Sequence, residues 1–150
     1  MSSKLVINST TEQKILRFMT PTKETIAEKA LALIESHFRL ISAGNLLAAR
    51  RQLFCPPGIA PRPIDTYLET MNRLKPFRLV SASVSRLEGV RRKRHGEVAT
   101  VWLNVVVVCS LGERAAQLVV WWFPETNEYQ ISARPSHWVI EALRGDREPS

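Results

Sequence analysis

The sequence has few of the side chains from which catalytic and metal sites are most often built. Its 150 residues include 2 cysteines and 3 histidines, which form no Cys-x-x-Cys pair and no cluster with zinc-ligand spacing. Aspartate occurs only at Asp65 and Asp146, and neither of the two most apolar strand-like segments carries an acid within its body. We therefore expect no bound metal and no cofactor, and residue types alone assign no catalytic set.

Long hydrophobic runs are also missing. The longest unbroken apolar run covers residues 118–123, whereas a membrane-spanning helix needs about 20 such residues. Near the N-terminus only Leu5-Val6-Ile7 is apolar, which is shorter than the core of a secretory signal. Because 45% of the residues are hydrophobic and 23% are charged, we expect a soluble globular protein of the cytoplasm, with one domain and no membrane partner.

Positive charge is in excess, with a formal net charge of +7, and much of it lies in one short segment. Residues 86–95 hold one acidic and five basic residues: Glu88 with Arg86, Arg91, Arg92, Lys93 and Arg94. Such a cluster can bind phosphates, but no aromatic residue is interleaved with it to stack on bases. We interpret residues 89–96 as a solvated basic turn between two strands, and we do not expect nucleic acid as a partner.

Helical periodicity is confined to the first half of the chain. Apolar residues recur at spacings of three or four from Ile26 to Ile41, which predicts a long amphipathic helix. Thr22 is its candidate N-cap, and Gly44 is the candidate residue after its end. Asn45 is expected to cap a second, shorter helix that extends through residue 54.

A loop and a third helix precede the strands. Prolines at 55–62 indicate a loop, and Pro63 opens a helix that stops near Pro76. Strand-like segments follow at 77–88, 97–109, 114–123 and 129–134. The fold class is therefore α+β, with three helices packed on a curved four-stranded antiparallel sheet. The expected organisation is an N-terminal arm at 1–21, the folded domain at 22–140 and a C-terminal tail at 141–150.

The turn at 110–113 sets the register of the two longest strands. If Ser110 pairs with Glu113, then Trp102 lies opposite Trp121. One face of the sheet is then wholly apolar, and we expect it to pack on the helices. The other face is mixed and still too apolar to leave in water, which predicts a homodimer formed through the sheet. The candidate interface residues are Trp102, Asn104, Gln117 and Trp121.

The order of elements resembles the nuclear-transport-factor-2-like superfamily, which has a cystatin-like α+β cone and includes the steroid-isomerase and SnoaL-like proteins. The helix pair at 26–46, with its small-residue turn, carries the resemblance together with the strand ends at 119–123 and 129–132. The resemblance implies a cone whose mouth holds a small apolar ligand, and a dimer formed through the sheet. The short segment 55–62 departs from the pattern, because many members insert a small hairpin there.

Candidate site residues follow from the chemistry that this resemblance implies. The aspartate-based mechanisms of the superfamily cannot be carried over, since no aspartate occupies a matching position. His37 lies on the apolar stripe of the first helix, where it is a satisfied core histidine, a ligand contact or a general base. Tyr67 either packs or donates its hydroxyl to a ligand, and Trp122 either packs or lines the pocket.

Three classes of function stay open. The first is a domain that binds a small apolar molecule in the cone cavity, with His37, Tyr67 and Trp122 as candidate contacts. The second is a SnoaL-like enzyme of isomerase, cyclase or hydrolase type that uses His37 and Tyr67. The third is a structural or assembly subunit, in which the mixed sheet face would contact another subunit.

Overall fold

The computed structural model describes residues 21–55, 62–94 and 96–132, which form three helices and five strands. In chain order they are α2 (Lys23–Ser42), α3 (Leu46–Arg51), β1 (Leu53–Phe54), α4 (Arg62–Leu74), β2 (Arg78–Lys93), β3 (Gly96–Cys109), β4 (Gly112–Phe123) and β5 (Glu128–Ser132). The expected arm, apart from residue 21, and the expected tail lie outside the described residues, as does most of the expected loop at 55–62.

The expected ends of helix α2 are confirmed. The side chain of Thr22 accepts a hydrogen bond from the Thr25 amide at 3.1 Å, which satisfies one amide of the first turn. At the other end Gly44 has a φ of +80°, and the Asn45 amide donates to the Leu40 carbonyl at 2.9 Å. This is the Schellman arrangement, which favours glycine because a Cβ strains that backbone conformation. Asn45 then caps α3 through its side chain, as expected.

The sheet has five strands in the order β1-β5-β4-β3-β2, rather than the expected four antiparallel strands. The second helix does not reach residue 54, because Leu53 and Phe54 leave it to form β1, which pairs in parallel with β5. The Ile131 amide also donates to the Gln52 carbonyl at 2.7 Å, which continues this contact toward α3. Two strand residues carry no periodicity of their own, so only their distant partner shows that they are a strand.

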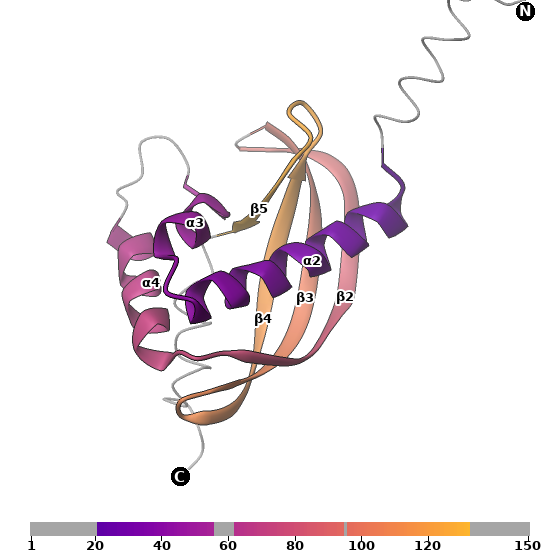
Figure 1. Cartoon of the computed structure of the whole chain (residues 1–150). Coiled ribbons are helices and arrows are strands. Elements are labelled where there is room, and N and C mark those ends of the chain that lie inside the picture. Colours follow the sequence, from indigo (N-terminus) through magenta and orange to yellow (C-terminus); the bar gives the residue numbers. More distant parts are fainter. Residues whose placement is uncertain (1–20, 56–61, 95, 133–150) are drawn as a thin grey trace, which may run out of the picture.

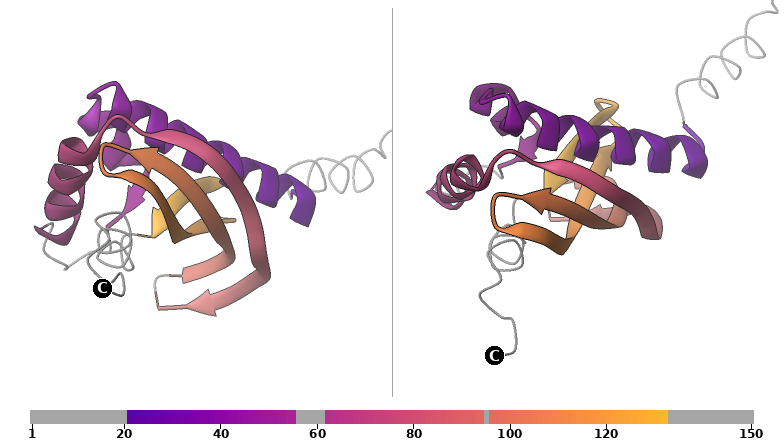
Figure 2. Two further views of the ribbon diagram at one scale, coloured as in Figure 1. Left: turned by 90° about the horizontal axis from the view of Figure 1, so that it is seen from below. Right: turned by 60° about the horizontal axis from the view of Figure 1, so that its bottom comes forward.

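Strand β2 runs through the segment that we interpreted as a basic turn, and that interpretation is wrong for residues 89–93. These residues pair with the start of β3 instead of leaving the sheet. Three register shifts interrupt the ladder between β2 and β3. Such bulges bend a strand and increase its twist, and Figure 2 shows β2 and β3 strongly curved.

The expected register between β3 and β4 is shifted by two residues. Cys109 pairs with Gly112, so Trp102 lies opposite Val119, and Asn104 lies opposite Gln117. The Ser110 amide donates to the Leu74 carbonyl of α4 at 2.9 Å, which ties the tip of this hairpin to a helix. A shift of two residues leaves every side chain on its expected face, because strand side chains alternate with a period of two.

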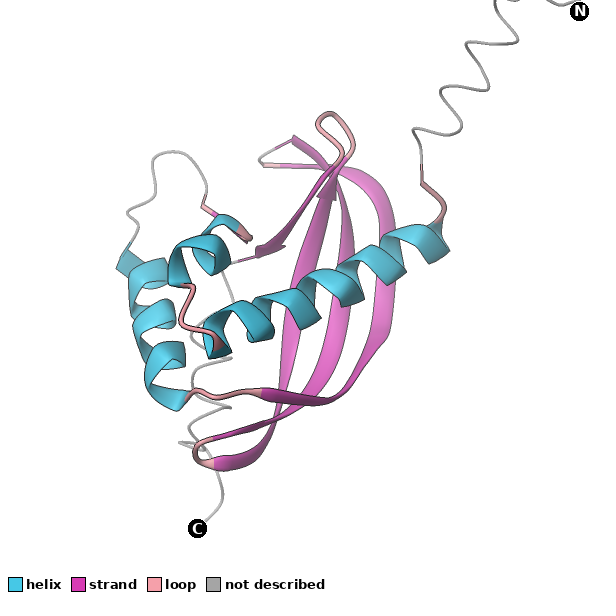
Figure 3. Cartoon of the chain, in the orientation of Figure 1, coloured by secondary structure: helices cyan, strands magenta, loops and turns pink. Residues whose placement is uncertain are grey.

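Helix α2 crosses one face of the sheet, while α3 and α4 lie toward one end of it (Figures 1 and 3). The expected packing is confirmed, since the side chains that β3 and β4 turn toward the helices are mostly buried. The central ones are Val101, Leu103, Val105, Leu118, Val120 and Trp122. They pack against the apolar stripe of α2 and the inner face of α4, which include Ile34, Phe38, Ile64 and Met71. In the described part of the chain, no helix is long and apolar enough to cross a membrane.

Candidate functional site

His37 and Tyr67 form a hydrogen-bonded pair inside the core. His37 is 0% exposed, and its Nε2 lies 3.0 Å from the hydroxyl of Tyr67 on α4. Its Nδ1 lies 2.9 Å from Oε1 of Gln52, the residue that ends α3. The rings of His37 and Tyr67 are stacked, with their centroids 5.9 Å apart and an interplanar angle of 9°. The pair and Gln52 therefore join α2, the end of α3 and α4.

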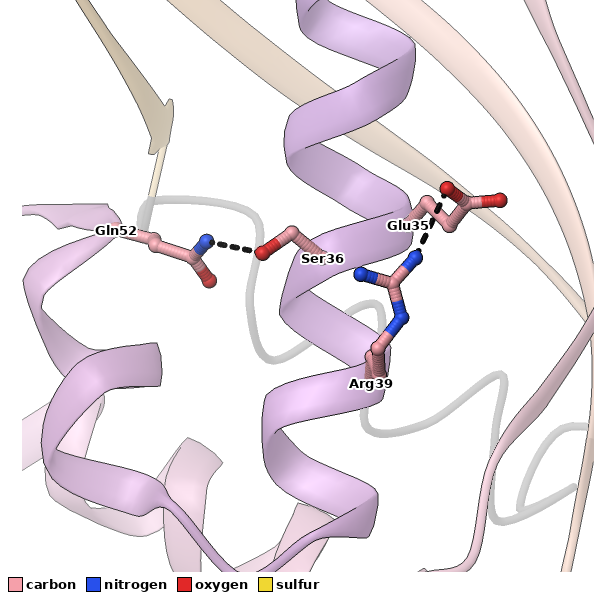
Figure 4. Close-up of polar contacts among 4 residues, drawn as sticks. All are labelled: Glu35, Ser36, Arg39 and Gln52. Atoms are coloured by element: carbon pink, nitrogen blue, oxygen red, sulfur yellow. Dashed lines mark hydrogen bonds and ion pairs between the residues drawn. The ribbon is translucent and has the colours of Figure 1, made fainter.

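Hydrogen bonding around Gln52 assigns the protons of this pair. The Gln52 amide nitrogen donates to Ser36 Oγ at 3.2 Å (Figure 4). Its oxygen is therefore left to accept from His37 Nδ1. His37 Nε2 then accepts from the Tyr67 hydroxyl, which leaves a neutral imidazole with both nitrogens satisfied. The ion pair of Glu35 and Arg39 on the same helix lies on exposed side chains and takes no part.

Burial keeps both members of the pair uncharged. It lowers the pKa of His37 from 6.5 to about 4, although the hydrogen bond with Gln52 acts in the opposite direction. It also raises the pKa of the Tyr67 hydroxyl well above its ordinary value of 10. At neutral pH the imidazole can accept a proton only at a large cost in free energy. This arrangement is typical of a satisfied core histidine, which was one of the three roles left open for it.

Trp122, the third candidate ligand contact, makes its polar contact elsewhere. It is 3% exposed on β4, and its indole nitrogen donates to Asn127 Oδ1 at 2.9 Å. Its ring lies 6.4 Å from that of Tyr129 on β5. The structure thus brings His37 and Tyr67 together but gives Trp122 a separate packing environment. Ligand contact by these three residues stays a prediction.

Replacing Tyr67 with Phe should destabilise the protein by about 1–3 kcal/mol, because it leaves His37 Nε2 buried without a partner. Urea unfolding at pH 7.5 measures this loss. Tyr129→Phe is the matched control, since the Tyr129 hydroxyl is buried and has no hydrogen-bond partner among the described residues. That control breaks no hydrogen bond among the described residues, so it should not lower the unfolding free energy. Equal losses in the two variants would contradict the role given to the Tyr67 hydroxyl.

A cavity of about 440 Å³ opens at the end of the sheet where β3 begins and β4 turns into β5. It is lined by Phe54, Arg94, Gly96, Glu97, Phe123, Glu125, Thr126, Glu128 and Gln130. None of the three candidate ligand contacts belongs to this lining. The register pairs Trp121 with Gln130 and Phe123 with Glu128, so these side chains lie on the face opposite that of the buried Val120 and Trp122. The cavity therefore lies on the mixed face, away from α2.

Two aromatic side chains, Phe54 and Phe123, belong to the lining of this cavity, and Trp121 packs beside them. The rings of Phe54 and Phe123 lie 5.1 Å apart, and that of Trp121 lies 5.4 Å from Phe54 and 6.3 Å from Phe123. Sequence reasoning missed Phe54 because residues up to 54 were assigned to a helix. The alternation of Trp121 and Phe123 along β4 was the available signal, since both fall on the mixed face.

The mixed face continues from the cavity toward the middle of the sheet. Trp102 and Trp121 are partly exposed there, and Gln117 donates to Asn104 Oδ1 at 3.4 Å. The guanidinium of Arg86 lies 4.5 Å from the centre of the Trp102 ring. An aromatic residue therefore does adjoin the basic segment, across the strand pair rather than along the chain. These residues lie on one face of the sheet, and the homodimer stays a prediction.

The basic segment of β2 is organised around one carboxylate. Glu88, with 12% of its side chain exposed, lies 3.1 Å from Lys93 Nζ, 3.4 Å from Arg91 and 3.8 Å from Arg86. The hydrogen bond from Lys93, with the nearby arginine charges, holds the pKa of Glu88 below its usual value. This ionised carboxylate offsets repulsion among the cations and allows them to share a strand.

The described residues contain no group of three or more His, Cys, Asp or Glu side chains that could hold a metal ion. Cys55 is exposed and Cys109 is buried, and neither forms a disulfide.

Comparisons with known proteins give one distant structural match. No family model matches the sequence, and no curated protein matches it. The structure is similar to a crystal structure from Xanthomonas campestris pv. campestris, of a protein provisionally described as a polyketide cyclase. The two chains share 13% identity with a TM-score of 0.36, over 78% of this chain and 98% of the other. At this distance the likeness carries no argument about function.

Proposed function

We propose that this protein binds a small apolar or aromatic molecule, and that the ligand occupies the cavity beside Phe54 and Phe123. The observation that carries the proposal is the cavity itself. Its volume of about 440 Å³ lies within the range of roughly 300–1,000 Å³ typical of small-molecule sites. Two aromatic side chains, Phe54 and Phe123, line it together with polar and charged side chains, which include the half-buried amide of Gln130. Such a site orients a ligand by few hydrogen bonds and gains affinity from apolar contact.

The competing location for a ligand is the pair of His37 and Tyr67, which an enzyme of this chain would also use. Both side chains are buried, and each satisfies the other within the core. A ligand could reach them only after the helices separate. The cavity on the mixed face needs no such opening, and this difference favours it.

Binding of N-phenyl-1-naphthylamine, a neutral apolar dye that fluoresces in apolar surroundings, tests the proposal. We expect a saturable rise in fluorescence at one site per chain. Phe123→Ala should weaken binding about tenfold or more, because it removes one of the two aromatic side chains that line the cavity. Leu47→Ala, which truncates a 63% exposed side chain on α3, is the control and should leave binding unchanged.

His37→Gln distinguishes the two locations. If it binds the dye as wild type does, the cavity is the site. If it stays folded but no longer binds, the ligand contacts His37 and the proposal is wrong. No saturable binding by the wild-type protein would also overturn it.

A role in assembly is a second candidate, favoured by the partly exposed tryptophans of the mixed face. We propose a homodimer through Trp102, Asn104, Gln117 and Trp121. Two-fold contact would bury the same surface on each subunit, next to the cavity.

A further inference from the structure

The charges around the cavity are opposite in sign to those of the whole protein. Three glutamates, Glu97, Glu125 and Glu128, line it against one cation, Arg94, which gives the lining a formal charge of 1 − 3 = −2. The complete chain has a net charge of +7. The cavity is therefore a local acidic region within a basic protein.

The three carboxylates keep their charge available to a ligand. In the described part of the chain, no ion pair joins any of them to a lysine or arginine, whereas Glu88 on the neighbouring strand contacts three cations. Arg92 lies opposite Glu97 in the register of β2 and β3, yet the structure places no ion pair between them. Arg86, Arg91 and Lys93 are thus directed toward Glu88, whereas Arg94 of the same segment lines the cavity.

The wall of the cavity suits a positive charge as well. The faces of aromatic rings attract cations, and the attraction grows when the cation is partly removed from water. Phe54 and Phe123 are partly buried, and they lie in the same lining as the three carboxylates. An ammonium group in this cavity would have both carboxylates and aromatic rings in its lining.

We infer that the ligand is an organic cation, a molecule with an apolar or aromatic body and one protonated amine. This inference rests on the proposed function, and it specifies the class of ligand for the same cavity. The apolar body would pack on Phe54 and Phe123, and the amine would lie among Glu97, Glu125 and Glu128. Arg94 opposes this charge, so it should weaken binding. A ligand with a carboxylate is disfavoured by the same arrangement.

Three indoles of similar size and different charge test the inference: tryptamine as cation, 3-ethylindole as neutral molecule and indole-3-acetate as anion. Their affinities are measured by displacement of N-phenyl-1-naphthylamine and by calorimetry at low salt. Tryptamine should bind about tenfold more tightly than 3-ethylindole, because its amine gains contacts with three exposed carboxylates, each of modest strength. Indole-3-acetate should bind more weakly than 3-ethylindole. The preference for tryptamine should shrink as salt is raised, because exposed charges are screened.

Variants of the charged lining residues then test whether these residues cause the preference for tryptamine. The triple variant Glu97→Gln, Glu125→Gln and Glu128→Gln should bind tryptamine and 3-ethylindole equally, while Arg94→Gln should bind tryptamine more tightly than wild type. Glu113→Gln, at the far end of β4, is the control and should change neither affinity.

The outcomes separate this inference from the proposed function. If the dye binds but tryptamine has no advantage over 3-ethylindole, the inference is wrong and the cavity remains a binding site. Tighter binding of indole-3-acetate would overturn the inference in the same way. If neither the dye nor any indole binds, both the inference and the proposed function fail.

Discussion

Acidification from pH 6.5 to pH 4 should remove about 3 kcal/mol of the free energy of unfolding through His37 alone. The pKa of this imidazole is about 4 in the folded protein and 6.5 when exposed, so the unfolded chain takes up a proton more readily. Stability contributed by neutral His37 is therefore fully present above pH 6.5 and falls as pH drops toward 4. A difference of about 2.5 pKa units corresponds to about 3 kcal/mol.

Urea unfolding at a series of pH values measures this dependence. The range from pH 6.5 to pH 5 isolates the histidine best, because carboxylates titrate mainly below it. His37→Gln should abolish most of the slope in this range, since its amide does not titrate and can still donate and accept. Parallel pH dependence in wild type and His37→Gln would contradict the assignment. NMR titration of the wild-type His37 ring provides a second check, because its resonances should stay constant down to about pH 5.

Replacing Trp102 with Glu should convert the proposed homodimer to monomers at micromolar concentration. Truncation of a tryptophan at the centre of an interface typically costs about 2 kcal/mol or more, and a two-fold dimer loses two copies. A total of about 4 kcal/mol raises the dissociation constant by roughly a thousandfold. Arg86, which lies over the Trp102 ring, would pair with the new carboxylate in the separated subunit and favour the monomer further.

Sedimentation velocity of wild type and variant measures the change. Leu47→Glu is the matched control, because it adds the same charge at a well-exposed apolar residue on α3, away from the sheet. It should leave the dimer intact. If the wild-type protein is already monomeric at micromolar concentration, the interface prediction is wrong. The mixed face would then serve the ligand cavity alone, and Asn104 and Gln117 would become candidate ligand contacts.

Local chemistry made the helix ends predictable from sequence. Thr22, Gly44 and Asn45 act within a few residues of themselves, through caps and a backbone conformation that glycine adopts easily. The assignment of sheet faces was predictable for a related reason. Side-chain alternation survives the two-residue error in the register between β3 and β4, so the buried and mixed faces were correctly separated.

Strand pairing depended on partners that sequence patterns do not reveal. β1 exists because β5 arrives beside it from nearly eighty residues further along the chain. Strand β2 continues through a run of like charges because Glu88 lies among them and pairs with three cations. In the observed register between β3 and β4, the Ser110 amide at the hairpin tip donates a hydrogen bond to the Leu74 carbonyl at the end of α4. The pairing of β1 with β5 and the hydrogen bond of Ser110 are long-range contacts, and their energies are absent from any local window of sequence.

The candidate site divides in the same way. The sequence by itself determined that His37 lies on the buried stripe of α2, and that Trp121 and Phe123 lie on the mixed face. Only the tertiary structure decided that His37 meets Tyr67 and Gln52, and that Phe54 joins the two aromatic residues at a cavity. Periodicity specifies which way a side chain points from its own element. What it meets depends on how separate elements pack, and that is settled by contacts between residues far apart in the chain.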